Sequence, residues 1–132
     1  MNGTATLAVS VGPVASEACS RWTLSGEAAE LLRWDQFVGG QDGDDWTGCG
    51  ISEVVVVSDA RAIDCVLEPE RDWEQLNRAF EHLDERGWQI TLLVPLIELG
   101  AAHEALRGAN ARIQGWWRRN RGALSFTSHE LA

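Results

Sequence analysis

The spacing of hydrophobic residues is most regular in the middle of the chain. Residues 54–57 are four consecutive valines, which is typical of a strand buried on both faces. A second apolar run, Ile63–Leu67, follows after a short turn around Asp59–Arg61. This close spacing predicts that the two strands form an antiparallel hairpin in the centre of a sheet.

A helix should follow this hairpin, beginning at Pro69 and ending near Arg86. Acidic residues lie in its first turn and Gly87 lies where a C-terminal cap is expected. Its apolar stripe consists of Trp73, Leu76, Phe80 and Leu83. The apolar run Gln89–Leu96 then predicts another strand, so residues 63–96 read as a β-α-β unit.

Towards the N-terminus, the pattern predicts one strand and one helix. Apolar residues alternate from Thr4 to Val11 until Gly12-Pro13, which predicts a strand that ends there. Ser25 suits an N-cap, and apolar residues then recur at helical spacing. These residues are Ala28, Leu31, Trp34 and Val38. We therefore expect a helix over Gly26–Val38, ended by the two glycines that follow.

Two interpretations compete at the C-terminal end. A helix is expected over Ile97–Arg107, and its spacing continues through residues 109–116, which favours one long helix. However, Gly108 and Gly115 would each cost about 1 kcal/mol inside a helix. We therefore favour a break at Gly108, followed by a strand or hairpin over Ile113–Phe126 that turns at residues 120–122.

These elements together predict an α/β or α+β fold, with a mixed sheet of about four to six strands and two or three helices packed on it. The length of 132 residues predicts one domain, 1–132, and the 45% hydrophobic content is enough for a buried core. No stretch approaches the roughly 20 apolar residues of a membrane span, and no basic leader is present. We therefore expect a cytoplasmic protein without membrane contact.

Composition excludes several kinds of chemistry. The chain has eleven arginines but no lysine, which excludes a phosphate-binding P-loop and a Schiff-base lysine. The three cysteines and three histidines form no closely spaced pair of the kind that holds structural zinc. The letters Ser128-His129-Glu130 resemble a catalytic triad, but consecutive residues cannot face one another as a triad requires. We assign no catalytic, cofactor or metal residue and expect a non-catalytic protein.

The acidic, glycine-rich segment 39–50 is expected to be a mobile loop. Its acids partly match a calcium-binding loop, but Trp46 and Thr47 stand where an oxygen ligand and a glycine are needed. Cys49 looks exposed, although the acids beside it would raise its pKa and make it a poor nucleophile. An alternative function is a small-molecule or metal-binding enzyme with its site near this loop, around Asp42, Asp44, Asp45 and Cys49.

Charge is distributed unevenly along a chain whose net charge is -9. Residues 41–85 hold thirteen acids and three arginines, whereas residues 86–132 hold three acids and six arginines. The opposite signs favour head-to-tail association or a charged partner.

A cluster of aromatic and basic residues lies in the C-terminal part. Its predicted protein-binding residues are Trp116, Trp117, Arg118, Arg119 and Arg121. Trp and Arg are enriched at interface hot spots, so we expect an accessory, regulatory or assembly protein that contacts a protein partner or its own copies. The alternative is nucleic-acid binding through segment 112–121, but only four arginines there could meet phosphates, and the rest of the chain is strongly negative.

Overall fold

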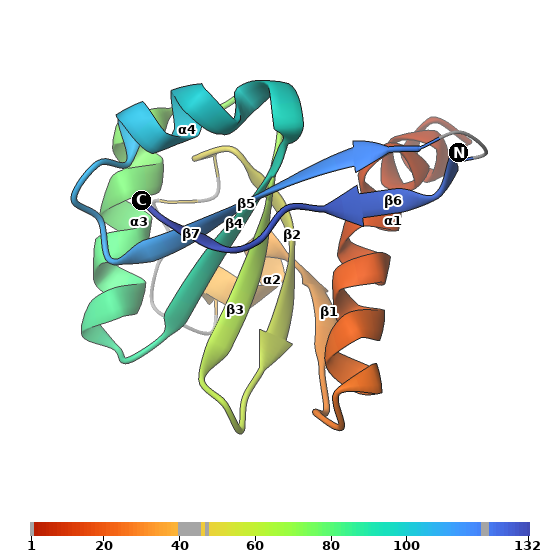
Figure 1. The fold of residues 1–132 in the computed structure, drawn as a ribbon, viewed down its shortest axis with the longest axis horizontal. Helices are drawn as coiled ribbons and strands as arrows, with labels where there is room; N and C mark the ends of the chain where they lie inside the picture. The colour runs from red at the N-terminus through yellow and green to blue at the C-terminus, as the bar shows by residue number, and fades with distance from the viewer. Residues whose placement is uncertain (1, 40–45, 47, 120–121) are drawn as a thin grey trace.

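The computed structural model describes residues 2–39, 46, 48–119 and 122–132. These residues form one mixed sheet with helices on both faces (Figure 1). The strands are β1 Glu30–Arg33, β2 Ile51–Val57, β3 Ala62–Leu67, β4 Gln89–Pro95, β5 Ala111–Arg118, β6 Leu124–Phe126 and β7 Glu130–Leu131. The α-helices are α1 Asn2–Leu24, α2 Trp34–Gly39, α3 Trp73–Glu85 and α4 Leu99–Ala105, and η2 Leu96–Glu98 is a 3-10 turn. The predicted fold class is confirmed, with more strands and helices than expected.

The sheet runs in the order β1-β2-β3-β4-β5-β6, and β7 also pairs with β5. Strands β3, β4 and β5 are parallel, whereas β1, β2, β6 and β7 pair antiparallel with their neighbours. The hairpin of β2 and β3 and the β-α-β unit of β3, α3 and β4 are therefore confirmed. Helix α3 begins a few residues later than expected, because Asp72 is its N-cap and accepts hydrogen bonds from the amides of Glu74 and Gln75.

The predicted break at Gly108 is also confirmed. Gly108 has a positive φ of 86°, which suits a glycine after a helix. Strand β5 begins three residues later and pairs antiparallel with β6, so the C-terminal segment is a hairpin and not a continued helix. The turn expected at residues 120–122 lies partly outside the described residues.

The predicted strand at Thr4–Val11 is wrong, because this segment belongs to the long helix α1. Pro13 lies inside that helix, although a proline removes one backbone hydrogen bond and costs about 3 kcal/mol there. The helix continues because Val14, Ala15 and Ala18 are buried against the sheet. Packing of this stripe outweighs the local effect of the proline, which the alternation of residues 4–11 could not indicate.

The predicted helix over Gly26–Val38 is wrong in its first part. Gly26 follows the end of α1, where its amide donates to the carbonyl of Thr23, and its φ is 92°. Residues 30–33 form edge strand β1, since each of them pairs with β2. Only the short helix α2 remains, in which Trp34, Phe37 and Val38 are buried. Pairing with a central strand decided the structure of this segment.

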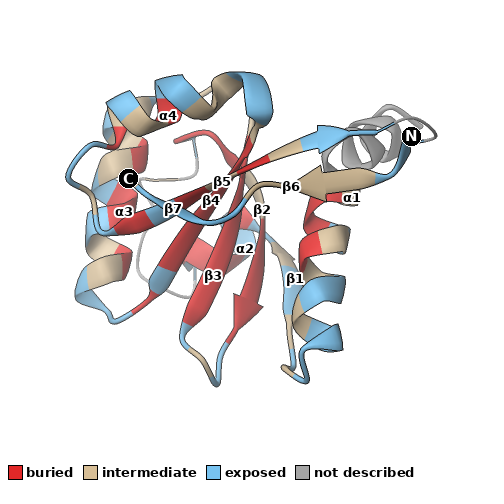
Figure 2. Cartoon of the chain, in the orientation of Figure 1, coloured by how far each residue is buried: buried red, intermediate tan, exposed pale blue. Residues whose placement is uncertain are grey.

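Each face of the sheet carries its own hydrophobic cluster, and the central strands between them are the most buried part of the molecule (Figure 2). Helices α2, α3 and α4 cover one face with a large cluster that includes Trp34, Phe80 and Leu92. Helix α1 covers the other face over β1, β2 and β3 with a smaller cluster. The candidate site lies on this second face, between α1 and the sheet.

The loop expected to be mobile at 39–50 lies mostly outside the described residues, as do Asp42, Asp44 and Asp45. Its described part is held to the core, because Trp34 Nε1 donates a 2.8 Å hydrogen bond to the carbonyl of Trp46. In the part of the chain that the structure describes, no helix is both long and apolar enough to cross a membrane.

Candidate functional site

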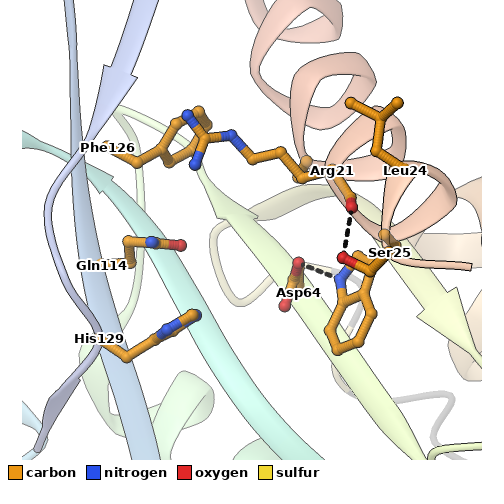
Figure 3. A pocket seen from close by; sticks show the side chains of 9 residues that line it. Arg21, Leu24, Ser25, Asp64, Gln114, Phe126 and His129 are labelled. Carbon is orange, nitrogen blue, oxygen red and sulfur yellow. Dashed lines mark hydrogen bonds between the residues drawn. The ribbon is translucent and has the colours of Figure 1, made fainter. Parts of the chain in front are cut away.

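A pocket of about 400 Å³ lies between the last turns of α1 and the face of the sheet (Figure 3). Helix α1 forms one wall, and the strands β3, β5 and β6 with the segment that follows β6 form the others. The lining residues are Ala18, Arg21, Trp22, Leu24, Ser25, Asp64, Gln114, Phe126 and His129. The pocket thus combines aromatic and apolar walls with a small number of polar groups, which is the usual character of a small-molecule site.

Asp64 is the unusual residue of this pocket. It lies in the middle of β3, a strand in which every residue is buried, and it is only 7% exposed. Its Oδ2 accepts a 2.8 Å hydrogen bond from Trp22 Nε1 of α1. Among the described residues, Asp64 has no other hydrogen bond and no ion pair. A buried carboxylate is normally paired with a cation or with several donors, so this one is undersatisfied.

Burial raises the pKa of Asp64 from its ordinary value of 3.8 to about 6, and the hydrogen bond from Trp22 opposes this rise only in part. Loss of water therefore outweighs the single donor. The carboxyl is ionised at neutral pH at a cost that a bound donor or cation would offset. A strongly shifted carboxyl in a pocket marks a candidate functional site.

Besides Ser25, whose hydroxyl donates to the carbonyl of Arg21, the polar residues Arg21, Gln114 and His129 also line the pocket. Arg21 stacks over the ring of Phe126 at 4.4 Å and also lies 3.5 Å from a carboxylate oxygen of Glu17. Gln114 donates from Nε2 to the carbonyl of Thr127 at 2.7 Å, which leaves its Oε1 as an acceptor. The ring of His129 also faces the pocket (Figure 3), and partial burial together with the nearby Arg112 lowers its pKa.

A row of polar residues continues from Asp64 across the sheet. Thr91 of β4 pairs in register with Asp64, and Arg112 of β5 pairs with Thr91. Residues in register on neighbouring strands point to the same face, so all three lie on the face of α1. Thr91 is 8% exposed. Thr91 and Asp64 are the buried polar residues among those whose burial the structure describes. A second hollow lined by Thr91, Arg112 and His129 adjoins the first.

Sequence reasoning did not find this site. The sequence excludes Ser128-His129-Glu130 as a catalytic triad, and Asp64 belongs to the apolar run Ile63–Leu67 that predicts a strand. The available signal was a charged residue within a run predicted to be a central strand, since such a position is buried and a charge there needs a reason. The contributions of Trp22 and Gln114 had no such signal, because they depend on how α1 and β5 pack.

The structure separates the residues of the predicted protein-binding cluster. Trp116 is half-buried on the face of α1, packed against the smaller hydrophobic cluster, whereas Trp117 points to the opposite face and is 37% exposed. Arg118 and Arg119 are exposed, and Arg118 Nη1 donates to the carbonyl of Gly122 at 3.3 Å. Arg121 lies outside the described residues. Arg112 is beside the pocket at the other end of β5, so the arginines of the nucleic-acid hypothesis do not form one compact group.

Cys49, His82 and His103 are buried or in contact with neighbouring side chains. Cys49 is buried and not exposed as expected, and this burial raises its pKa to about 11, which leaves little thiolate for nucleophilic chemistry. His82 packs against Trp46 with their ring centroids 4.5 Å apart, and His103 Nε2 lies 2.7 Å from Glu130 Oε1. Over the described ranges, no three His, Cys, Asp or Glu side chains are grouped so that they could hold a metal ion.

Comparisons with protein-family models, with curated proteins and with solved structures gave no match to this chain. The function is therefore argued from the pocket itself.

Proposed function

We propose that this chain binds a small molecule in the pocket between α1 and the sheet. The observation that carries the proposal is Asp64, a buried carboxylate that lines the pocket and has no cationic partner among the described residues. An ionised carboxylate in such a place lowers stability, and a ligand that donates to it would offset that cost. The volume of about 400 Å³ falls within the roughly 300–1,000 Å³ typical of small-molecule sites.

The hydrogen bond from Trp22 Nε1 to Asp64 offers a direct reporter, because an indole N–H gives its own signal in a proton-nitrogen NMR spectrum. We expect fragments that enter the pocket to shift this signal in a saturable way. The signal of Trp117, which lies on the opposite face of the sheet, should not move and serves as the internal control. Trp22→Phe and Trp117→Phe identify the two signals. A broad panel of fragments that leaves the Trp22 signal unchanged would contradict the proposal.

The second candidate function is contact with another copy of this chain through an apolar patch formed by Leu96, Ile97 and Trp117. These side chains are 44%, 94% and 37% exposed. Pro95, the last residue of β4, pairs in register with Trp116, so η2, which begins at Leu96, follows beside the end of β5 where Trp117 lies. The basic residues Arg118 and Arg119 lie directly beyond Trp117. Such a mixture of aromatic, aliphatic and arginine side chains is typical of an interface centre.

The occupant that fits this patch is the acidic surface of a second copy. Helix α3 exposes Glu81 and Glu85, whose charge complements that of the two arginines, whereas Glu74 lies 3.6 Å from Arg78 of the same helix. Light scattering should show a mass that rises with protein concentration and falls with added salt. Ile97→Ser should reduce the association, and Leu131→Ser, at another exposed apolar residue, is the matched control. A monomer at every concentration would contradict this second function.

A further inference from the structure

The pocket contains a buried carboxylate, Asp64, whose capacity to accept hydrogen bonds is not fully used. Asp64 uses Oδ2 to accept from Trp22 and has a second oxygen with no described partner. Gln114 donates one N–H of its Nε2 to the carbonyl of Thr127, which leaves its Oε1 as an acceptor and the second N–H of Nε2 as a donor. An ionised carboxylate can only accept hydrogen bonds. A ligand that meets Asp64 must therefore donate.

The arginines near the pocket do not neutralise Asp64. Arg21 is held over Phe126 and beside Glu17, and it forms no ion pair with Asp64. Arg112 is two strands away in the same row, which corresponds to about 10 Å between the Cα atoms at the usual spacing of strands. No described cation pairs with Asp64, so a ligand would have to supply the positive charge that neutralises it.

The aromatic wall of the pocket and the negative net charge of the chain both favour a cationic ligand. The ring of Trp22 lines the pocket, and aromatic faces attract cations, whereas one face of Phe126 already carries the guanidinium of Arg21. The chain carries a net charge of -9, and such a field raises the local concentration of cations and lowers that of anions. Arg112, which lies near His129, is at the far end of the polar row from Asp64, so the positive group of a ligand belongs at the Asp64 end of that row.

On the basis of the proposed function, we infer that the ligand is a small organic cation with a planar head group, such as an amidinium, guanidinium or protonated heterocycle, whose N–H groups donate to Asp64. Two parallel N–H donors suit a carboxylate best, and the aromatic walls accept a flat apolar body. An anionic ligand of the same shape would meet an uncompensated carboxylate and be rejected.

Three probes of one shape test this inference, because benzamidine, benzamide and benzoate differ mainly in charge. Each is titrated at constant ionic strength into the wild-type chain, Asp64→Asn and the exposed-turn control Asp59→Asn, with the Trp22 indole signal as the readout. We expect benzamidine to bind at least about tenfold more tightly than benzamide, as a charge-assisted hydrogen bond implies, and benzoate not to bind. In Asp64→Asn, the affinity for benzamidine should fall about tenfold, to that for benzamide. Asp59→Asn should keep the wild-type preference for benzamidine.

The possible failures are distinguishable. Equal affinities for the three probes, or a preference for benzoate, would overturn the inference and leave the small-molecule pocket in place. The same holds if none of the three binds while neutral or anionic fragments of the broad panel shift the Trp22 signal. If the fragments that bind from that panel are organic cations with another planar head group, the inference is supported, whereas cations without a planar head group would contradict it. A Trp22 signal that no compound moves would refute both the proposed function and the cation inference.

Discussion

Replacing Asp64 with asparagine should stabilise the folded chain at neutral and alkaline pH. Asparagine has nearly the same shape and keeps an acceptor for Trp22 Nε1, but it carries no charge. The ordinary pKa of the carboxyl is 3.8, and burial raises it to about 6 in the folded chain. At 1.36 kcal/mol for each pKa unit, this difference corresponds to about 3 kcal/mol of lost stability in the wild-type chain above pH 6.

The direction of the pH dependence follows from where the proton is held. Below pH 3.8 the carboxyl is protonated in both the folded and the unfolded chain, so it causes no loss. Between pH 3.8 and about 6 the unfolded chain has released the proton and the folded chain retains it, so folding stability falls as the pH rises through this window. Above about pH 6 the loss is complete. Arg21, Arg112 and His129 lie around the site in both chains, so their own titration contributes mainly to the stability that the two chains share.

Urea unfolding of the wild-type chain and of Asp64→Asn at several pH values from 4 to 8 measures this effect. The two free energies of unfolding should be similar near pH 4, and the variant should be more stable by about 3 kcal/mol at pH 8. Burial also raises the pKa values of Glu53 and Glu68, but their contributions cancel in the difference. Asp59→Asn should change stability by no more than about 0.5 kcal/mol. A constant difference between pH 4 and 8, or a variant that is less stable at pH 8, would refute the reasoning.

Three further predictions concern the surroundings of the site and the core. Trp22→Phe removes the donor to Asp64, so the pKa of that carboxyl should rise above about 6 in a carbon-13 NMR titration, and an unchanged value would contradict the hydrogen bond. Gly50→Ala should lower the free energy of unfolding by at least about 2 kcal/mol, since a methyl group there would lie 2.7 Å from Arg71 Cα at a φ of 115°, whereas Gly48→Ala meets no neighbouring atom and is the control. Ellman's reagent should modify half-buried Cys19 first and leave buried Cys49 and Cys65 unreacted until the chain unfolds. Rapid reaction of all three thiols in the folded protein would contradict the burial of Cys49 and Cys65.

The parts of the fold that could be predicted from the sequence are those in which local pattern and final packing agree. The valine run of β2 and the apolar stripe of α3 show within a few consecutive residues which side chains are buried. The structures of both elements were therefore predicted correctly. Strand β1 could not be recognised in this way, because it is mostly exposed and exists through its pairing with β2. In helix α1, the described packing residues Val14, Ala15 and Ala18 follow Pro13, whereas the alternation of apolar residues at 4–11 favours a strand.

The candidate site was less predictable than the fold, for a physical reason. Its residues come from α1, β3, β5, β6 and the segment after β6, and they meet only when the sheet is assembled. Only Asp64 carried a local signal, as a charge within an apolar strand. The conspicuous cluster at 116–121 divides between two faces of β5, since neighbouring strand residues point in opposite directions.

The ionisation of Asp64 with and without a bound cation tests the central claim most directly. The carbon-13 signal of its carboxyl, followed against pH, should give a pKa of about 6 for the free chain. With benzamidine at a saturating concentration, the pKa should fall towards the ordinary range of an aspartate, because a cation in contact favours the ionised form. An unchanged pKa at saturation would show that the ligand does not meet Asp64 and would contradict the account.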